Sequence, residues 1–176
     1  MNRVCPHVSA VCVAAVSILT VSSSEGAERW QTASGFLSVE KPNEDSYEPA
    51  RPISPPQLAR WRSPNGSMEF AVELVPPLPE GTPSLKQIER AYSTKDTTVT
   101  RRPSRKSGKH DIWIIETLNT DVKQLIAIVH HDEWFHRLRV TGLAAAFDMN
   151  SAEAFVKSIT IKAGKWEPPS RSLKRK

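Results

Sequence analysis

The sequence DIWIIETLNTDVKQLIAIVHHDEWFHRLRVTG, residues 111–142, decides the fold of this chain of 176 residues. Its first segment, residues 112–118, is nearly all β-branched or aromatic, and its apolar side chains alternate to both faces. Residues 122–131 also leave no polar face toward solvent. Both segments are therefore predicted to be strands that are covered on both sides of a sheet.

A third strand and a helix follow this pair. After a short turn at residues 131–133, residues 134–141 alternate between an apolar and a more polar set, which predicts an antiparallel strand with one less buried face. Beyond a loop, Asn150 is expected to cap a helix, with Glu153 three residues later. The residues expected on the buried face of this helix are Ala152, Phe155, Val156 and Ile159. The helix should lie across the sheet.

Shorter elements are predicted before this core. Residues 67–74 alternate with the period of a half-buried strand. Thr82 is expected to cap a short helix with Pro83 at its first position. The apolar face of that helix consists of Leu85, Ile88 and Tyr92. Residues 97–102 predict a short edge strand, and the basic residues 101–109 predict a solvated hairpin tip.

The outer segments are assigned different roles. Residues 1–27 have the basic start, apolar stretch and small residues of a secretory signal peptide, which predicts a secreted or periplasmic protein. Their apolar run is too short to span a bilayer, so the mature chain is expected to have no transmembrane segment. Residues 28–60 are rich in proline and are expected to form a linker or arm. Residues 61–163 are predicted to form one α/β sandwich domain, and residues 164–176 a basic disordered tail.

The order of these elements resembles a known superfamily. The strand at residues 134–142, the helix that ends at residues 154–161 and the opening strand at residues 68–74 resemble the Mog/PsbP-like superfamily, which includes DcrB-type exported proteins. The resemblance covers residues 61–162 and implies an α+β fold, with a mostly antiparallel sheet and helices packed against it. It also implies a non-catalytic protein that acts in binding or assembly. It carries over no site residue, because no defined site of the family matches a position here.

The sharpest chemical hypothesis concerns the turn between the last two predicted strands. His130, His131, Asp132, Glu133 and His136 bring imidazoles and carboxylates, which are ligands of zinc or copper, into a short span. Because His130 and His131 are neighbours on a strand, they point to opposite faces, and at most one of them can join His136. The alternative interpretation is a polar turn beside a half-buried His136.

Composition and motifs exclude other chemistry. Both cysteines, Cys5 and Cys12, lie inside the expected signal peptide, so the mature chain would have no thiol nucleophile, disulfide or cysteine-ligated metal. The sequence has no Gly-x-Ser-x-Gly elbow of a serine hydrolase. Residues 101–109 have no interleaved aromatic residue to stack bases, so nucleic acid is not an expected partner despite the net charge of +5.

The sequence therefore predicts an exported, non-catalytic binding or assembly module without catalytic residues or a cofactor. Its partner is expected to be a protein or an envelope component, which would contact the sheet face, the basic loop or the proline-rich arm. The alternative is an exported zinc- or copper-binding protein that uses the His130–His136 hairpin.

Overall fold

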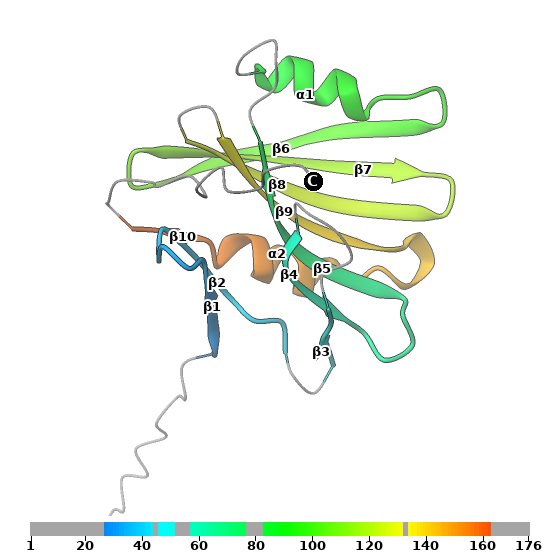
Figure 1. Ribbon diagram of the computed structural model, residues 1–176. Coiled ribbons are helices and arrows are strands. Elements are labelled where there is room, and N and C mark those ends of the chain that lie inside the picture. The colour runs from blue at the N-terminus through cyan, green and yellow to red at the C-terminus, as the bar shows by residue number, and fades with distance from the viewer. Residues whose placement is uncertain (1–26, 44–45, 52–56, 77–82, 132–133, 163–176) are drawn as a thin grey trace, which may run out of the picture.

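The computed structural model describes residues 27–43, 46–51, 57–76, 83–131 and 134–162. Within them, a seven-stranded antiparallel sheet has the order β3-β4-β5-β9-β8-β7-β6, and a smaller sheet has the order β1-β2-β10 (Figure 1). The strands are β1 (Arg29–Gln31), β2 (Leu37–Glu40), β3 (Glu48–Pro49), β4 (Gln57–Arg62), β5 (Met68–Val75), β6 (Thr97–Ser107), β7 (His110–Asn119), β8 (Val122–His131), β9 (Trp134–Leu143) and β10 (Thr160–Ile161). The helices are α1 (Leu85–Tyr92), α2 (Met149–Lys157) and a 3₁₀ turn, η1 (Ala144–Ala146).

The mostly antiparallel sheet of the expected α+β fold is confirmed, and the three strands predicted from residues 111–142 are its β7, β8 and β9. The expectation that helices cover the sheet is confirmed only in part, because most of the fold is strand and the two helices do not form the cover by themselves. On one face, α2 shares the cover with β2 and β10, while α1 packs on the other face near β6 and β7.

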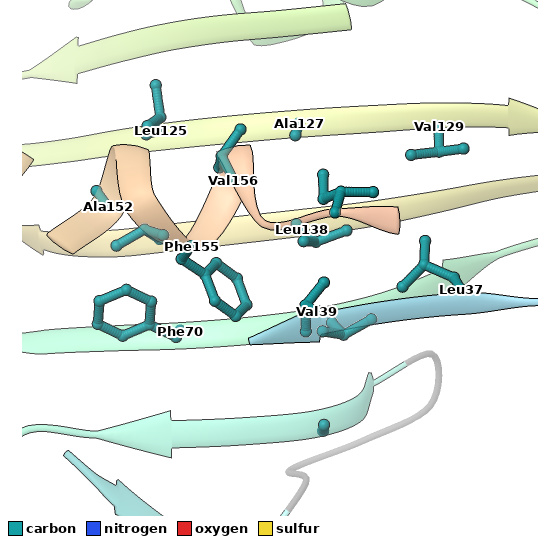
Figure 2. Close-up of a cluster of buried hydrophobic side chains, with 14 of the residues drawn as sticks. Leu37, Val39, Phe70, Leu125, Ala127, Val129, Leu138, Ala152, Phe155 and Val156 are labelled. Atoms are coloured by element: carbon teal, nitrogen blue, oxygen red, sulfur yellow. The ribbon is translucent and has the colours of Figure 1, made fainter. Parts of the chain in front are cut away.

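The apolar side chains on the two faces of β8 belong to two separate hydrophobic cores. On the first face, Leu125 and Val129 lie in a cluster with Phe155 and Val156 of α2 and with Leu37 of β2. Figure 2 shows these helix side chains above β8 and β9, with Phe155 beside Phe70 and with Leu37 and Val39 beside Leu138. On the second face, the buried residues are Ile88, Ile115, Ile126, Ile128 and Phe135. The strand is thus covered on both sides, as predicted.

Each helix begins at a different residue from the one expected. Ser84 caps α1, where its hydroxyl accepts from the Gln87 amide and the Gln87 side chain accepts from the Ser84 amide. The predicted cap at Thr82 is therefore wrong. Asp148 caps α2 and accepts from the amides of Asn150 and Ser151 at 3.0 and 3.1 Å, which places the expected cap Asn150 inside the helix. A carboxylate that accepts from two free amides and a hydroxyl outcompetes the amide side chain two residues later.

The basic segment belongs to an edge strand. The strand β6 has 11 residues and pairs with β7 from Thr97 to Ser107, with a bulge between Arg102 and Arg105. Most of the segment predicted as a hairpin tip is therefore strand, and the turn is confined to Gly108 and Lys109. Gly108 has a φ of 59°, which a residue without a Cβ adopts at low cost. The strand accommodates its cationic side chains because several of them have hydrogen-bond or ion-pair partners. Arg105, for example, donates to the carbonyl of Ile159 at 2.8 Å.

The expectation of a linker or arm over residues 28–60 is wrong for the described part of that range. It contains β1, β2 and β3 and most of β4, and Phe36, Leu37, Val39 and Tyr47 are buried in the main core. The strands of three and four residues, β1 and β2, precede Pro42, the first proline of the range. They pair with each other, and β2 also pairs with β10. The domain therefore extends well before Trp61.

The signal peptide and the basic tail remain predictions. Residues 1–26 and 163–176, which hold nearly all of the expected signal peptide and the basic tail, lie outside the described residues. Asp132 and Glu133 also lie outside them. Among the helices of the described part, none is long and apolar enough to cross a membrane.

Replacing Leu37 by alanine tests whether the N-terminal segment belongs to the core. Leu37 is 0% exposed, and a Leu→Ala change at a buried site costs about 2–5 kcal/mol of unfolding free energy. We expect that loss in urea denaturation of Leu37→Ala. The matched change Leu143→Ala, at a side chain 53% exposed, should cost under about 0.5 kcal/mol. If both variants lost the same small amount of unfolding free energy, the N-terminal segment would not belong to the core, and residues 28–60 would be better described as a linker.

Candidate functional site

The structure brings together two of the histidines named in the metal hypothesis. His131 at the end of β8 and His136 on β9 are both buried, and the His131 Nε2 and His136 Nδ1 atoms lie 2.6 Å apart. The ring of Phe36 packs against both, with centroid distances of 4.8 and 5.8 Å, and against His110 at 5.4 Å. An aromatic residue from the N-terminal segment thus seals the pair from solvent.

His130 lies on the opposite face of the sheet. Its ring stacks on Trp113 at 6.4 Å with an interplanar angle of 8°, and it also contacts Phe135 at 5.0 Å. The prediction that only one of the adjacent histidines joins His136 is confirmed, and that one is His131. The expectation of a half-buried His136 is wrong, because His136 is 0% exposed.

A zinc or copper site does not form from these histidines within the described residues. There, no group of three or more His, Cys, Asp or Glu side chains is placed to hold a metal ion. Two imidazole nitrogens at hydrogen-bond distance interact with each other, whereas metal ligands surround the ion with lone pairs directed at it. The pair therefore has the geometry of a structural hydrogen bond.

Burial makes this pair sensitive to acid. The pKa of His136 is lowered from 6.5 to about 3, first by desolvation and then by the nearby His131. The imidazole is therefore neutral in the folded protein at neutral pH. Protonation would place a cation in the core, where burial and the nearby His131 both oppose the charged form.

Charged side chains occupy the other face of the sheet beyond α1. The Glu73 carboxylate on β5 is buried and accepts from Arg137 and, at 2.9 Å, from Arg139, both on β9. Arg137 also donates to the Tyr92 hydroxyl at the end of α1 at 2.8 Å. Each arginine side chain is 29% exposed, so the network is a semi-buried link between the sheet and the helix.

A groove follows the outer side of α1 along β6. The inner side of α1 packs Ile88 on Ile115 and Ile126, so the residues on its outer side rise as a wall beside the edge strand. The groove has a volume of about 520 Å³. Its lining residues are Lys86, Glu89, Arg90, Ser93, Val99 and Arg101. Three cations and one carboxylate make it basic.

The basic residues of this groove can be read from the sequence, but the groove itself was not predicted. From the sequence, the first helix was described by its apolar face, Leu85, Ile88 and Tyr92, and Arg101 was assigned to the end of an edge strand and to a solvated hairpin tip. The signal that could have combined them is the order of an amphipathic helix and a basic β-prone segment within a few residues of each other. Their contact is local: Arg101 donates to the two Glu89 carboxylate oxygens at 2.5 and 2.7 Å.

Comparisons with known proteins identify the fold. No family model matches this chain, and no curated protein matches it. A solution structure of cyanobacterial PsbP (CyanoP) from Synechocystis sp. PCC 6803 is similar with a TM-score of 0.56 at 10% identity, covering 77% of this chain and 92% of that one. A crystal structure from Bacteroides thetaiotaomicron VPI-5482 is similar with a TM-score of 0.52 at 11% identity, covering 81% of this chain and 51% of that one. The chain has a PsbP-like fold, as its sequence suggested.

Acid should destabilise the protein through His136. In the unfolded chain a histidine titrates near its ordinary pKa of 6.5, whereas the folded value is about 3. Between these values the unfolded state binds the additional proton, so stability falls as pH decreases below 6.5, by up to about 1.4 kcal/mol per pH unit. Urea denaturation from pH 7.5 to 4.5 measures this slope. The variant His136→Gln should have a shallower slope, and identical slopes would contradict the assignment.

Neutralising Glu73 should destabilise the fold without changing its shape. The variant Glu73→Gln leaves Arg137 and Arg139 facing each other without their shared carboxylate, at a cost of about 3 kcal/mol. Thermal and urea denaturation measure the loss. Glu40→Gln, which removes the carboxylate of an exposed pair with Arg29, is the control and should cost under about 1 kcal/mol. Equal costs would mean that the buried network contributes no more than a surface pair.

Proposed function

We propose that this protein is an exported accessory module that binds a partner protein without catalysing a reaction, and that the groove between α1 and β6 makes the contact. The observation that carries the proposal is the groove itself. It is wide, lined mainly by charged side chains and bordered by the edge strand of the large sheet. Such a surface offers hydrogen bonds and charge to another chain rather than an enclosed pocket for a small substrate.

The histidine pair supports the same interpretation. Its two imidazoles are engaged with each other and lie beneath Phe36, so they contribute to the core. A general base must reach the proton of a bound substrate, and these buried rings are poorly placed to do so. The resemblance to PsbP-like proteins agrees with an accessory role. It does not carry the argument, because it concerns the fold and not the function.

Export is the second part of the proposal. It depends on residues 1–27, whose basic start, apolar stretch and small residues are typical of a secretory signal. The protein isolated from its source should begin near residue 28, because the signal would be removed. Mass spectrometry of the N-terminal peptide identifies the first residue of the isolated protein. Export would be contradicted if the protein were found only in cell extract and still began at Met1.

Photo-crosslinking tests the partner and the place of contact together. A photoreactive amino acid replaces Lys86 or Arg90 in the groove, or the exposed Leu58 on β4 as the control position. The full chain is then irradiated with envelope and secreted fractions of the source organism. We expect one protein, identified by mass spectrometry, to be captured from both groove positions and not from Leu58. Capture from Leu58 alone, or from no position, would overturn the proposal.

A further inference from the structure

We infer that the groove receives an extended acidic peptide, which adds to β6 as a further strand of the sheet. This inference rests on the proposed function and specifies the chemistry of the partner segment. Three properties of the described residues lead to it: the edge of the sheet, the wall formed by α1 and the charge of the lining.

The first property is an open backbone edge. The strand β6 ends the large sheet and pairs, among the described strands, with β7 alone. Its pairing is regular from Thr97 to Arg102, before the bulge and Pro103 interrupt it. In an antiparallel pair, alternate residues direct their N–H and C=O groups away from the partner. Thr97 already donates its amide to the Thr94 carbonyl at 3.3 Å, so the open stretch of the edge before the bulge is residues 98–102. These residues present donors and acceptors to an incoming strand.

The second property is the helix beside that edge. Because α1 packs over β6 and β7 through Ile88, its outer side stands next to the position that an added strand would occupy. The half-exposed Val99 and the exposed Arg101 form the floor between them. Side chains of a strand alternate between the two faces of a sheet, so every second side chain of the added peptide would enter the groove. Pairing between an edge strand and a peptide beside a helix is an established mode of peptide recognition.

The third property is charge. Glu89 is engaged by Arg101, while Lys86 and Arg90 form no ion pair with another described residue. Their charges are available to carboxylates of a peptide in the groove. They also attract an acidic partner from a distance at low ionic strength.

The same charges disfavour a second copy of the chain as the occupant. Joining two β6 edges would place side by side two strands that each carry the cations Arg101, Arg102, Arg105 and Lys106. Three of them, Arg101, Arg102 and Lys106, also pair with carboxylates of their own copy. Like charges opposite each other across strands are destabilising. An acidic peptide reverses the sign of that interaction, and we therefore assign the groove to a different protein.

Titration of the full chain with synthetic peptides tests the inference. The probe is an acetylated peptide of about eight residues, a common strand length, with alternating Glu and Val. Amide hydrogen exchange of residues 98–102 is measured by NMR before and after saturation. We expect the outward-facing amides of this segment to exchange at least about tenfold more slowly. The amides of β8, in the middle of the sheet, should not change.

Two control peptides separate pairing from charge. A version with every amide N-methylated keeps the carboxylates but donates no backbone hydrogen bond, so it should bind at least about tenfold more weakly. A peptide with Lys in place of Glu should not bind measurably. Equal binding of the methylated peptide would overturn strand addition, and equal binding of the Lys peptide would overturn the preference for acid.

Matched variants locate the effect. Lys86→Glu with Arg90→Glu reverses two charges in the groove and should weaken the Glu–Val peptide about tenfold. Arg51→Glu with Arg62→Glu reverses the same number of charges at the opposite edge of the sheet and should leave affinity within about twofold. Equal effects would mean that net charge alone is responsible. If photo-crosslinking finds a partner in the groove but the peptide protects no amide of β6, strand addition is wrong and the proposed function stands; failure of both rejects both.

Discussion

The apolar character of both faces of β8 is the constraint on which the rest of the structure depends. Leu125 and Val129 project to one side and Ile126 and Ile128 to the other, and all four are buried. Each such side chain contributes about 1.5–3 kcal/mol when removed from water, so together they match the whole stability of a typical domain. Neither face of the sheet can therefore be left open at this strand. One cover comes from α1, and the other comes from α2 together with the small sheet.

The second cover explains the unexpected role of the N-terminal segment. With nine residues, α2 is too short to shield the full length of β8 and β9, and β2 extends the cover with Leu37 and Val39. Arg29 fastens this layer, since its guanidinium donates to the Ser158 carbonyl at 2.8 Å just after α2. Phe36 then closes the end of the core above the histidine pair. Packing of the N-terminal segment and neutrality of His136 are thus coupled, because protonation of His136 would place a charge on the surface against which Phe36 packs.

Sequence reasoning succeeded where periodicity runs through eight or more residues. It found β5, β7, β8 and β9 and the buried face of α2, because alternation over such lengths reports burial directly. It failed for β1 and β2, whose three and four residues are too short to show a period. In addition, β2 pairs with β10, which lies more than a hundred residues away in the sequence. Sequence reasoning placed His130 and His131 on opposite faces but did not say which of them joins His136. Burial of the pair depends on Phe36, whose place in the core was not predicted. The groove was missed because it arises from two elements that were each read alone.

The two edges of the large sheet differ in a way that bears on function. At one edge, β3 has two residues, one of them Pro49, which gives almost no backbone for another chain to join. At the other, β6 has 11 residues, and a bulge with Pro103 interrupts it only after a regular stretch. Its charges oppose pairing with an identical edge, yet they do not block the backbone itself. The proposed addition of an acidic strand rests on this contrast, because only the β6 edge combines a regular stretch of backbone with positive charge.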